Sequence, residues 1–328
     1  MFSNIFGNIK RGDKYLDCLR DFILQKYNIN AISIIPAKRG YYGETWRLNT
    51  ADNCYFIKLD YSPNKEIYKR SFPVLEHLKN HGIDSISKIV KNTENELFTY
   101  FNSAVLGIFE WIDGDNIQNE QTKIEEYKIL AEIYAVSFDG IVIPSDEFSM
   151  ANADLFYRQW DKLKNDSANK NSADVLAVLE QYNSRFKERA DRLALFAEKC
   201  KSDTSHFYIT HGDAGGNVIV NDNKYYLVDW DDVRLAPPER DAWFCLYWEW
   251  AMTAFNGALK ENGIDYVLRS ERLAYYCYDM FFFYLNAYMK TYFALGGSIA
   301  EILLDYLNGW IEEEIQYADT VYISKKYN

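Results

Sequence analysis

The segment from residue 206 to residue 244 constrains the fold of this chain more than any other, because short apolar runs alternate there with fixed polar groups. It reads HFYITHGDAGGNVIVNDNKYYLVDWDDVRLAPPERDAWF. Two β-type runs, Val218–Val220 and Tyr225–Val228, flank the turn residues Asn221–Asn223, and this pattern predicts a β-hairpin. The polar residues before and after the hairpin therefore stand at strand ends, where loops hold functional groups over a rigid scaffold.

Three of these polar residues form the set that phosphoryl transfer needs. The carboxylate of Asp213 can accept or orient the proton of an attacking hydroxyl group. The amide oxygen of Asn217 and the carboxylate of Asp229 can hold Mg²⁺, a hard cation that prefers oxygen ligands. Asp and Asn are also common in ordinary solvated turns. The prediction therefore depends on the complete ordered set and on further parts upstream.

The ordered pattern HGD…N…DWD resembles the catalytic loop and metal site of the aminoglycoside phosphotransferase family, whose members are relatives of the protein kinases. The tail Asp229–Asp231, Leu235–Pro237 and Glu239–Asp241 is most similar to the branch that contains the spectinomycin phosphotransferases. The wider family also includes choline, homoserine, methylthioribose and fructosamine kinases. The resemblance implies an α+β, two-lobed protein-kinase-like fold. Its N-terminal lobe (1–113) is an antiparallel β-sheet with a helix and binds the nucleotide, and its larger, mostly helical C-terminal lobe (114–328) carries the catalytic groups and binds the acceptor.

One departure from the family pattern lies in the catalytic loop. The family usually places four residues between the Asp and the Asn, whereas only Ala214, Gly215 and Gly216 separate Asp213 from Asn217. Two glycines can take backbone angles that are closed to other residues, so a shorter loop can still aim Asn217 at a metal ion. A weakened or inactive site is the alternative reading of the same loop.

A second constellation precedes the catalytic segment, over residues 31–60. The pattern is strand, glycine-containing loop, strand, turn, and a strand ending near Lys58. By the resemblance, Gly40 and Gly43 let backbone N–H groups approach phosphates. Lys58 matches the phosphate-gripping lysine of the kinase V-A-I-K pattern. A glycine pair alone also fits an ordinary hairpin turn.

The resemblance implies a carboxylate that holds Lys58. Glu66 lies eight residues further on and is the preferred candidate. Glu76 is the alternative, but it lies past Pro73, a residue that breaks or starts a helix.

A hinge and three supporting residues complete the expected site. Backbone groups around Glu110 and Ile112 are expected to bind the adenine edge. A buried edge strand followed by a turn is the other interpretation of that segment. His211, Asp231 and Asp241 are expected to support the catalytic loop structurally, without chemistry of their own.

Composition limits the partners that this chain can take. Its net charge is −12 and its pI about 4.9, which argues against nucleic-acid binding, since that needs basic surface. An acidic surface is compatible with a cationic acceptor. The five cysteines are scattered without C-x-x-C spacing, so we expect reduced thiols and neither a disulfide framework nor a zinc site. No secretory signal or transmembrane run is recognised, so we expect a cytoplasmic protein with no membrane partner. We expect it to be a monomer or a homodimer.

Periodicity predicts the remaining elements. We expect a helix over 13–27 capped by Asp13, strands over 86–90, 97–101 and 104–112, and helices over 122–138, 153–164 and 174–201. After Pro237–Pro238 a helix opens at 239–241 and continues through AWFCLYWEWAMTAF. Residues 265–320 are aromatic and helical, with a break at Gly296–Gly297.

The acceptor is the part that the motifs do not encode. Trp248, Glu249, Asp279 and the run Glu312–Glu314 are candidate substrate contacts, although each residue type is more common as a core ring or a solvated charge. Trp243, Tyr247, Trp248 and Trp250 could cage a quaternary ammonium group. On one continuous helix, Trp243 and Tyr247 would share a face while Trp248 and Trp250 would not.

Three functions remain open at this point. The first is an ATP- or GTP- and Mg²⁺-dependent O-phosphotransferase that acts on an aminoglycoside or aminocyclitol antibiotic, and hence confers antibiotic resistance. The second is a metabolic kinase of the same fold that acts on choline, an amino alcohol or a sugar. The third is a nucleotide-binding pseudo-enzyme, which only the short loop supports.

Overall fold

The computed structural model describes residues 11–37, 43–61, 66–165, 172–244, 248–295 and 298–326. Contacts divide the chain into two compact units. The first unit consists of Met1–Pro144 and His211–Arg234, and the second of Ser145–Thr210 and Leu235–Asn328. Each unit thus combines two separate stretches of sequence, and residues 211–234 of the catalytic segment belong with the N-terminal stretch.

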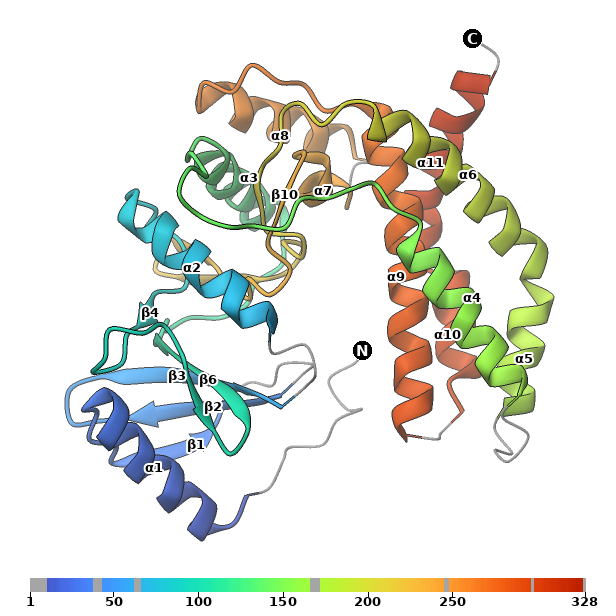
Figure 1. The fold of residues 1–328 in the computed structure, drawn as a ribbon. Coiled ribbons are helices and arrows are strands. Elements are labelled where there is room, and N and C mark those ends of the chain that lie inside the picture. The colour runs from blue at the N-terminus through green and yellow to red at the C-terminus, as the bar shows by residue number, and fades with distance from the viewer. Residues whose placement is uncertain are drawn as a thin grey trace. The chain divides into compact units, whose positions relative to one another are not determined.

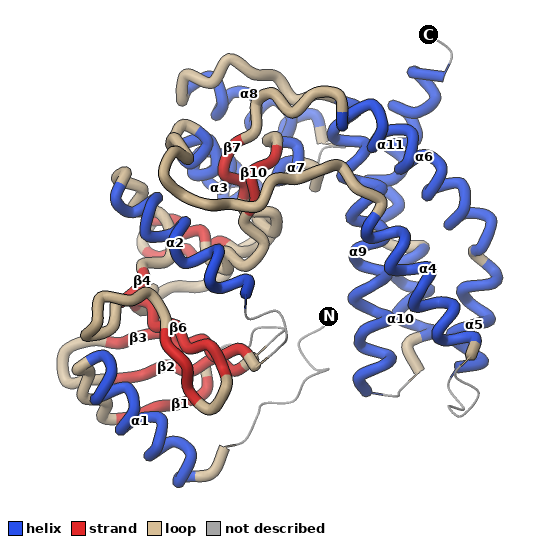
Figure 2. The backbone as a smooth tube through the Cα atoms, viewed as in Figure 1, coloured by secondary structure: helices blue, strands red, loops and turns tan. Residues whose placement is uncertain are grey.

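The first unit is built on an antiparallel sheet (Figures 1 and 2). Among the described residues the strand order is β1-β2-β3-β6-β4, and β5 also pairs with β6. The strands are β1 (Ser33–Pro36), β2 (Glu44–Asn49), β3 (Cys54–Asp60), β4 (Ile89–Val90), β5 (Thr99–Phe101) and β6 (Ala104–Glu110). The predicted β-sheet lobe is confirmed, although β4 and β5 are shorter than the runs that the sequence indicates.

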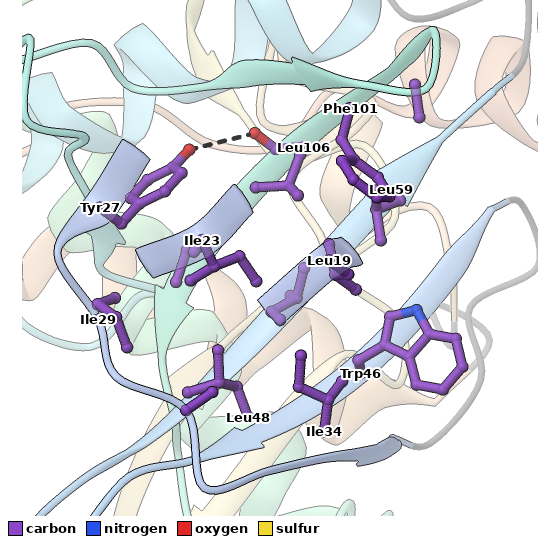
Figure 3. Packing of buried hydrophobic residues seen from close by; sticks show 14 residues of the cluster. Leu19, Ile23, Tyr27, Ile29, Ile34, Trp46, Leu48, Leu59, Phe101 and Leu106 are labelled. Atoms are coloured by element: carbon purple, nitrogen blue, oxygen red, sulfur yellow. Dashed lines mark hydrogen bonds between the residues drawn. The ribbon is translucent and has the colours of Figure 1, made fainter. Parts of the chain in front are cut away.

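Helix α1 (Asp13–Tyr27) covers one face of this sheet (Figure 3). Its apolar side chains Leu19, Ile23 and Tyr27 are buried against strand residues such as Leu48 and Leu106. Tyr27 also donates a hydrogen bond to the Leu106 carbonyl oxygen (3.5 Å). The predicted helix is confirmed, but its N-cap is Gly12 and not Asp13, which lies in the first turn.

Helix α2 (Glu66–Asn80) packs on the sheet through aromatic rings. The Phe72 ring lies so close to Gly107 of β6 that a Cβ at that glycine would meet ring carbons at 2.6–2.7 Å. The helix continues through Pro73, so the expectation that Pro73 breaks or starts a helix is wrong. Burial of Phe72 and Val74 on either side of the proline holds this part of the helix in place.

The predicted catalytic hairpin is present as β8 (Val218–Asn221) and β9 (Lys224–Leu227). Asp222 and Asn223 form its two-residue turn, with φ values of 45° and 64°. Two central residues with positive φ define the type I′ turn that suits the twist of a hairpin, and Asp and Asn tolerate this conformation well. Helix α3 (Glu120–Tyr134) contacts both strands.

The second unit is mostly helical, and helix α9 (Ser270–Leu295) forms its centre. It packs against α4, α6 and α11, and its buried aromatic side chains include Tyr278, Phe281 and Phe282. The other elements are α4 (Ala151–Lys164), α5 (Ser172–Gln181), α6 (Asn183–Lys201), β7 (Tyr208–Thr210), β10 (Arg234–Ala236), α7 (Glu239–Ala242), α8 (Glu249–Glu261), α10 (Ala300–Leu307) and α11 (Ile311–Lys326). The predicted break at Gly296–Gly297 lies outside the described residues.

Two predicted helices are each divided in the structure. The run 174–201 is interrupted at Tyr182, which lies between α5 and α6. The hydroxyl group of Tyr182 donates a hydrogen bond to Asn308 Oδ1 (2.9 Å). The helix that opens at Glu239 ends at Ala242, and Trp243 packs against Trp310 with ring centroids 6.4 Å apart. In both cases a contact from far along the chain overrides local helix periodicity.

Candidate active site

Lys58 is the centre of a charge cluster in the first unit. It lies on β3, opposite Thr45 of β2 and Gly107 of β6. Its ammonium Nζ donates to Asp229 Oδ1 and to Asp231 Oδ2, both at 2.7 Å. The side chain of Lys58 is only 11% exposed. One buried ammonium group therefore holds two carboxylates that enter from the end of the catalytic hairpin.

The charges in this cluster shift one another's protonation. Burial lowers the pKa of Lys58, but the two carboxylates raise it well above its usual value, so the ammonium stays charged. Burial raises the pKa of Asp229, and the Lys58 charge outweighs this and leaves it below its usual value. Burial raises the pKa of Asp231 to about 6, against the opposing effect of Lys58. Asp229 is therefore the carboxylate of the pair that stays ionised over the wider pH range.

Asp229 also has an unusual backbone. Its φ value is 67°, in the left-handed region that L-residues other than Asn, Asp and Gly seldom adopt. This conformation turns the chain sharply after β9 and directs the carboxylate of Asp229 to Lys58. Strained backbone of this kind is common at functional sites.

The short catalytic loop brings Asp213 and Asn217 into direct contact. Asn217 Nδ2 donates to the Asp213 carbonyl oxygen (2.6 Å) and to Asp213 Oδ2 (3.2 Å). The loop closes as a tight turn, with the Asn217 N–H donating to the Ala214 carbonyl oxygen (3.2 Å). Gly216 adopts a positive φ of 110°, a backbone angle that is open to glycine and closed to most other residues. Three intervening residues thus suffice to place the amide beside the carboxylate.

His211 anchors this loop to the hairpin. The Asp213 N–H donates to His211 Nδ1 (3.2 Å), so Nδ1 is the acceptor nitrogen of the ring. The other nitrogen, Nε2, then carries the proton and donates to the Val228 carbonyl oxygen (2.9 Å). The ring is completely buried. It therefore links the residue that begins the loop to the residue just before Asp229.

The hairpin is also bonded to segments that the sequence analysis did not connect with it. The Leu227 N–H donates to the Ser85 carbonyl oxygen (2.9 Å), and Asp115 and Val220 exchange two backbone hydrogen bonds of 3.1 and 2.8 Å. Asn116 Nδ2 donates to the Gly216 carbonyl oxygen. The bonds of Asp115 and Asn116 join the hairpin and the catalytic loop to the segment that follows β6. No local pattern around residues 85 or 115 signals these contacts.

The other nucleotide-site candidates are placed unequally. Gly43 has a φ of 90°, and a Cβ there would meet the Leu59 carbonyl oxygen at 2.2 Å, so only glycine fits. Gly40 and the side chain of Glu66 lie outside the described residues. The alternative carboxylate, Glu76, pairs with Lys91 (2.7 Å). Among the described side chains, the charge partners of Lys58 are Asp229 and Asp231.

The expected hinge follows β6 directly. Glu110 is its last residue, and the Glu110 N–H donates to the Lys88 carbonyl oxygen (2.9 Å). Trp111 continues the pairing, with its N–H donating to the Cys54 carbonyl oxygen (3.2 Å). Ile112 lies two residues after the end of β6 and is half-buried.

The candidate substrate contacts fall in the second unit. Trp248 is 42% exposed and stacks on Trp250, with ring centroids 5.6 Å apart. The prediction that these two rings point apart is wrong, because the continuous helix it assumed is broken and Trp248 has an extended backbone. Glu249 is exposed at the start of α8. Asp279 accepts a hydrogen bond from Asn152 Nδ2 (2.9 Å).

The remaining second-unit candidates are held by neighbours or lie outside the described residues. Glu312 pairs with Arg189 (2.8 Å), and Glu314 is fully buried, which favours a structural role for this acidic run. Asp241 is buried in α7. Tyr247, a proposed member of the aromatic cage, lies outside the described residues.

The fold, the buried lysine with its two carboxylates and the aspartate of the loop before the hairpin are typical of a phosphotransferase class of enzyme. Comparison with known families agrees. The sequence model of the phosphotransferase enzyme family matches residues 33–275, and the chain belongs to that family. It is therefore a phosphotransferase. A search of curated proteins finds no match.

Solved structures show the same fold at low sequence identity. The crystal structure of spectinomycin phosphotransferase with ADP and spectinomycin matches with a TM-score of 0.70 at 19% identity, covering 92% of this chain and 97% of that one. An aminoglycoside phosphotransferase from Alicyclobacillus acidocaldarius matches with a TM-score of 0.60 at 12% identity, covering 94% and 96%. Choline kinase LicA from Streptococcus pneumoniae matches with a TM-score of 0.62 at 12% identity, covering 94% and 100%.

Two searches concern what else the chain can hold or cross. No helix in the described parts of the chain is long and apolar enough to span a membrane. Within those same parts, no group of three or more His, Cys, Asp and Glu side chains could hold a metal ion.

Proposed function

We propose that this chain is an ATP- and Mg²⁺-dependent O-phosphotransferase that transfers the γ-phosphate to a hydroxyl group of an aminoglycoside- or aminocyclitol-type antibiotic. The observation that carries the proposal is the convergence of Asp229 and Asp231 on the ammonium group of Lys58. In the same unit, the amide of Asn217 is hydrogen-bonded to the carboxylate of Asp213. Family membership supports the reaction class. Related structures with bound ADP and AMP support the choice of an adenine nucleotide, with GTP as the alternative.

Each group has a distinct role in this proposal. Asp213 accepts or orients the proton of the acceptor hydroxyl, because its carboxylate stands beside the metal-type amide of Asn217. Asn217 Oδ1 and the Asp229 carboxylate would hold Mg²⁺, whose charge offsets that of the phosphates. Lys58 grips the phosphates, while Asp231 shares its ammonium group. Most of the rate enhancement then comes from positioning and charge neutralisation.

The nucleotide site belongs to the N-terminal half in this account. Backbone N–H groups near Gly40 and Gly43 approach the phosphates, and Glu110 and Ile112 bind the adenine edge. We assign nucleotide binding to residues 1–113 and catalytic and acceptor binding to residues 114–328. His211 and Asp241 brace the catalytic loop. We place the enzyme in the cytoplasm, where ATP is available.

The acceptor is proposed to be cationic. The net charge of −12 favours an amine-bearing ligand over an anionic one. The similarity in fold to spectinomycin phosphotransferase is the strongest of the three matches reported above. Trp248, Glu249 and Asp279 supply aromatic surface and negative charge for such a ligand. If the acceptor is an antibiotic, the biological role is resistance.

A specific observation favours a second candidate, a choline-type kinase. The stacked and partly exposed Trp248 and Trp250 offer the π surface that a quaternary ammonium group binds. A fold shared with choline kinases is compatible with this. The pseudo-enzyme alternative is the least favoured, since the short loop brings Asn217 to Asp213 instead of holding it away.

The test is ADP release with Mg-ATP over a panel of acceptors: spectinomycin, several aminoglycosides, choline and small sugars. Asp213→Ala is the site variant. Asp52→Asn is the matched control, because Asp52 is an exposed carboxylate in the turn between β2 and β3. Phosphorylated product is identified by mass spectrometry, so ATP hydrolysis alone does not count.

The outcomes separate the candidates. Turnover of one antibiotic that is lost in Asp213→Ala and kept in Asp52→Asn supports the first. Turnover restricted to choline or a sugar moves the assignment to the second. Nucleotide binding with no product from any acceptor contradicts both and leaves a binding module.

A further inference from the structure

Lys58 has a third neighbour, contributed by the helix where a carboxylate partner is expected. Its Nζ lies 5.1 Å from the centroid of the Tyr68 ring. Tyr68 stands on α2, two residues after Glu66, and is 1% exposed. Its ring stacks on Phe72, with centroids 5.3 Å apart, and Phe72 lies against Gly107 of β6. The ring is thus fixed from behind by the sheet.

The ring face is what Tyr68 offers to Lys58. Its hydroxyl oxygen is buried and has no hydrogen-bond partner among the described residues. An ammonium group over an aromatic face is attracted by the ring quadrupole, and the attraction is strongest where water is excluded. Lys58 and Tyr68 are both buried, so this condition holds.

The ring also answers a problem that the carboxylates create. Asp229 and Asp231 both accept from Lys58 on the hairpin side. If these two carboxylates alone positioned the ammonium group of Lys58, that group would shift whenever Asp229 bound a ligand. A fixed π face on α2 keeps the ammonium near the end of β3 while Asp229 exchanges partners. Among the described carboxylates of this helix, Glu76 is paired with Lys91 and does not perform this task. The side chain of Glu66 lies outside the described residues.

We propose that Tyr68 is a positioning residue for nucleotide binding, in which its ring face holds the Lys58 ammonium group where it grips the phosphates. This inference rests on the proposed role of Lys58 in the phosphotransferase reaction. The hydroxyl group of Tyr68 has no part in it.

Two substitutions separate the ring from the hydroxyl group. Tyr68→Phe keeps the ring face and removes the unpartnered hydroxyl, so KM for ATP stays within about twofold of the wild-type value. Tyr68→Leu keeps an apolar side chain but removes the π face, so KM for ATP rises about tenfold while kcat changes less than about threefold. Binding of Mg-ADP, measured by titration calorimetry, follows the same order.

The chain contains a matched control for this experiment. Tyr127 on α3 is also 1% exposed, and Lys123 Nζ lies 5.4 Å from its ring centroid. Tyr127→Leu therefore removes a similar buried ring and a similar contact away from Lys58. It is expected to lower the thermal unfolding midpoint about as much as Tyr68→Leu and to leave KM for ATP unchanged.

The outcomes decide the proposal. A raised KM in Tyr68→Leu, rescued by phenylalanine and absent from Tyr127→Leu, supports it. Equal loss in Tyr68→Phe and Tyr68→Leu overturns it, because the hydroxyl group then matters. Equal KM changes in the two leucine variants also overturn it, because the effect then reflects packing alone. Failure of the underlying function is distinguishable, since wild type would then show no magnesium-dependent nucleotide binding.

Discussion

Two lysines of the first unit, Lys58 and Lys123, have similar neighbours, but their carboxylate partners lie at very different separations along the sequence. Lys58 and Lys123 each place an ammonium group over a buried tyrosine ring, and each is 2.7 Å from a carboxylate oxygen. For Lys123 the carboxylate is Glu126, three residues along the same helix. For Lys58 the carboxylates are Asp229 and Asp231, more than 170 residues away in sequence.

The difference distinguishes a site from a fold contact. A helix places residues three positions apart side by side without any tertiary structure, so the Lys123 pair follows from local geometry. The Lys58 cluster needs the sheet and the hairpin to form first. It also holds two carboxylates on one ammonium group, which leaves negative charge for a second cation. Under the proposed function, the surplus negative charge would serve to bind a metal ion beside the phosphates.

The largest effect is expected at Asp229. Asp229→Asn keeps the shape and removes the ligand charge, so turnover should fall about a thousandfold and saturation should need more Mg²⁺. Asp84→Asn is the matched control, since Asp84 pairs with Lys88 at the same 2.7 Å but only four residues away. Steady-state rates across a magnesium series check this. A similar loss of turnover in both variants would contradict the functional difference between the long-range Lys58 pair and the local Lys88 pair.

A smaller effect, on stability, is expected from a hydrogen-bond network in the second unit. This network tests whether a large separation in sequence between two partners is enough to identify a functional site. Tyr266 donates to Glu239 Oε1 (2.6 Å), and the Arg269 N–H donates to the same oxygen (2.6 Å). Tyr266→Phe should cost about 1–3 kcal/mol of unfolding free energy by leaving the buried carboxylate short of a donor. Chemical denaturation measures the loss. Turnover below the unfolding transition should stay within about threefold, and a selective fall in kcat would break the comparison.

The smallest effect is expected at Asp203. Hydrogen bonds from Ser205, and then the Arg269 guanidinium, lower the pKa of this carboxyl group. A lowered folded-state pKa gives stability that is present above the unfolded pKa of about 3.9 and is lost as pH falls. Because Asp203 is 37% exposed, the contribution is below about 1 kcal/mol. Urea unfolding of wild type and Asp203→Asn should differ at pH 7 and converge below about pH 4. If the difference in unfolding free energy between the two proteins were the same at every pH, the effect would come from side-chain packing and not from the charge of Asp203.

The sequence predicted the parts of the site that short-range patterns encode. The hairpin, its Asn/Asp turn and the closeness of Asn217 to Asp213 follow from residues within a few positions of one another. The pairing of Asp231 with Lys58, and the placement of Tyr68 over it, depend on how α2 and the hairpin pack on β3. Nothing local specifies that packing.

The same reason explains the predicted helices that were too long. Tyr182 bonds to Asn308 and Trp243 packs on Trp310, in each case across more than sixty positions. Helical periodicity continues through both residues because it reports only local amphipathic pattern. The stacking of Trp248 on Trp250 could not be predicted for a related reason, because the two rings meet only where the helix is broken.

The most direct measurement is a Mg-ATP titration of wild type, Lys58→Met and Lys123→Met at a temperature where all three are folded. Methionine keeps the length of each side chain and removes its charge. The account predicts that Lys58→Met weakens binding about tenfold to a hundredfold, the range for a lost charge-assisted contact, and that Lys123→Met binds within about twofold of wild type. Equal affinities in all three proteins would contradict the assignment of Lys58 and its carboxylates to the phosphate site.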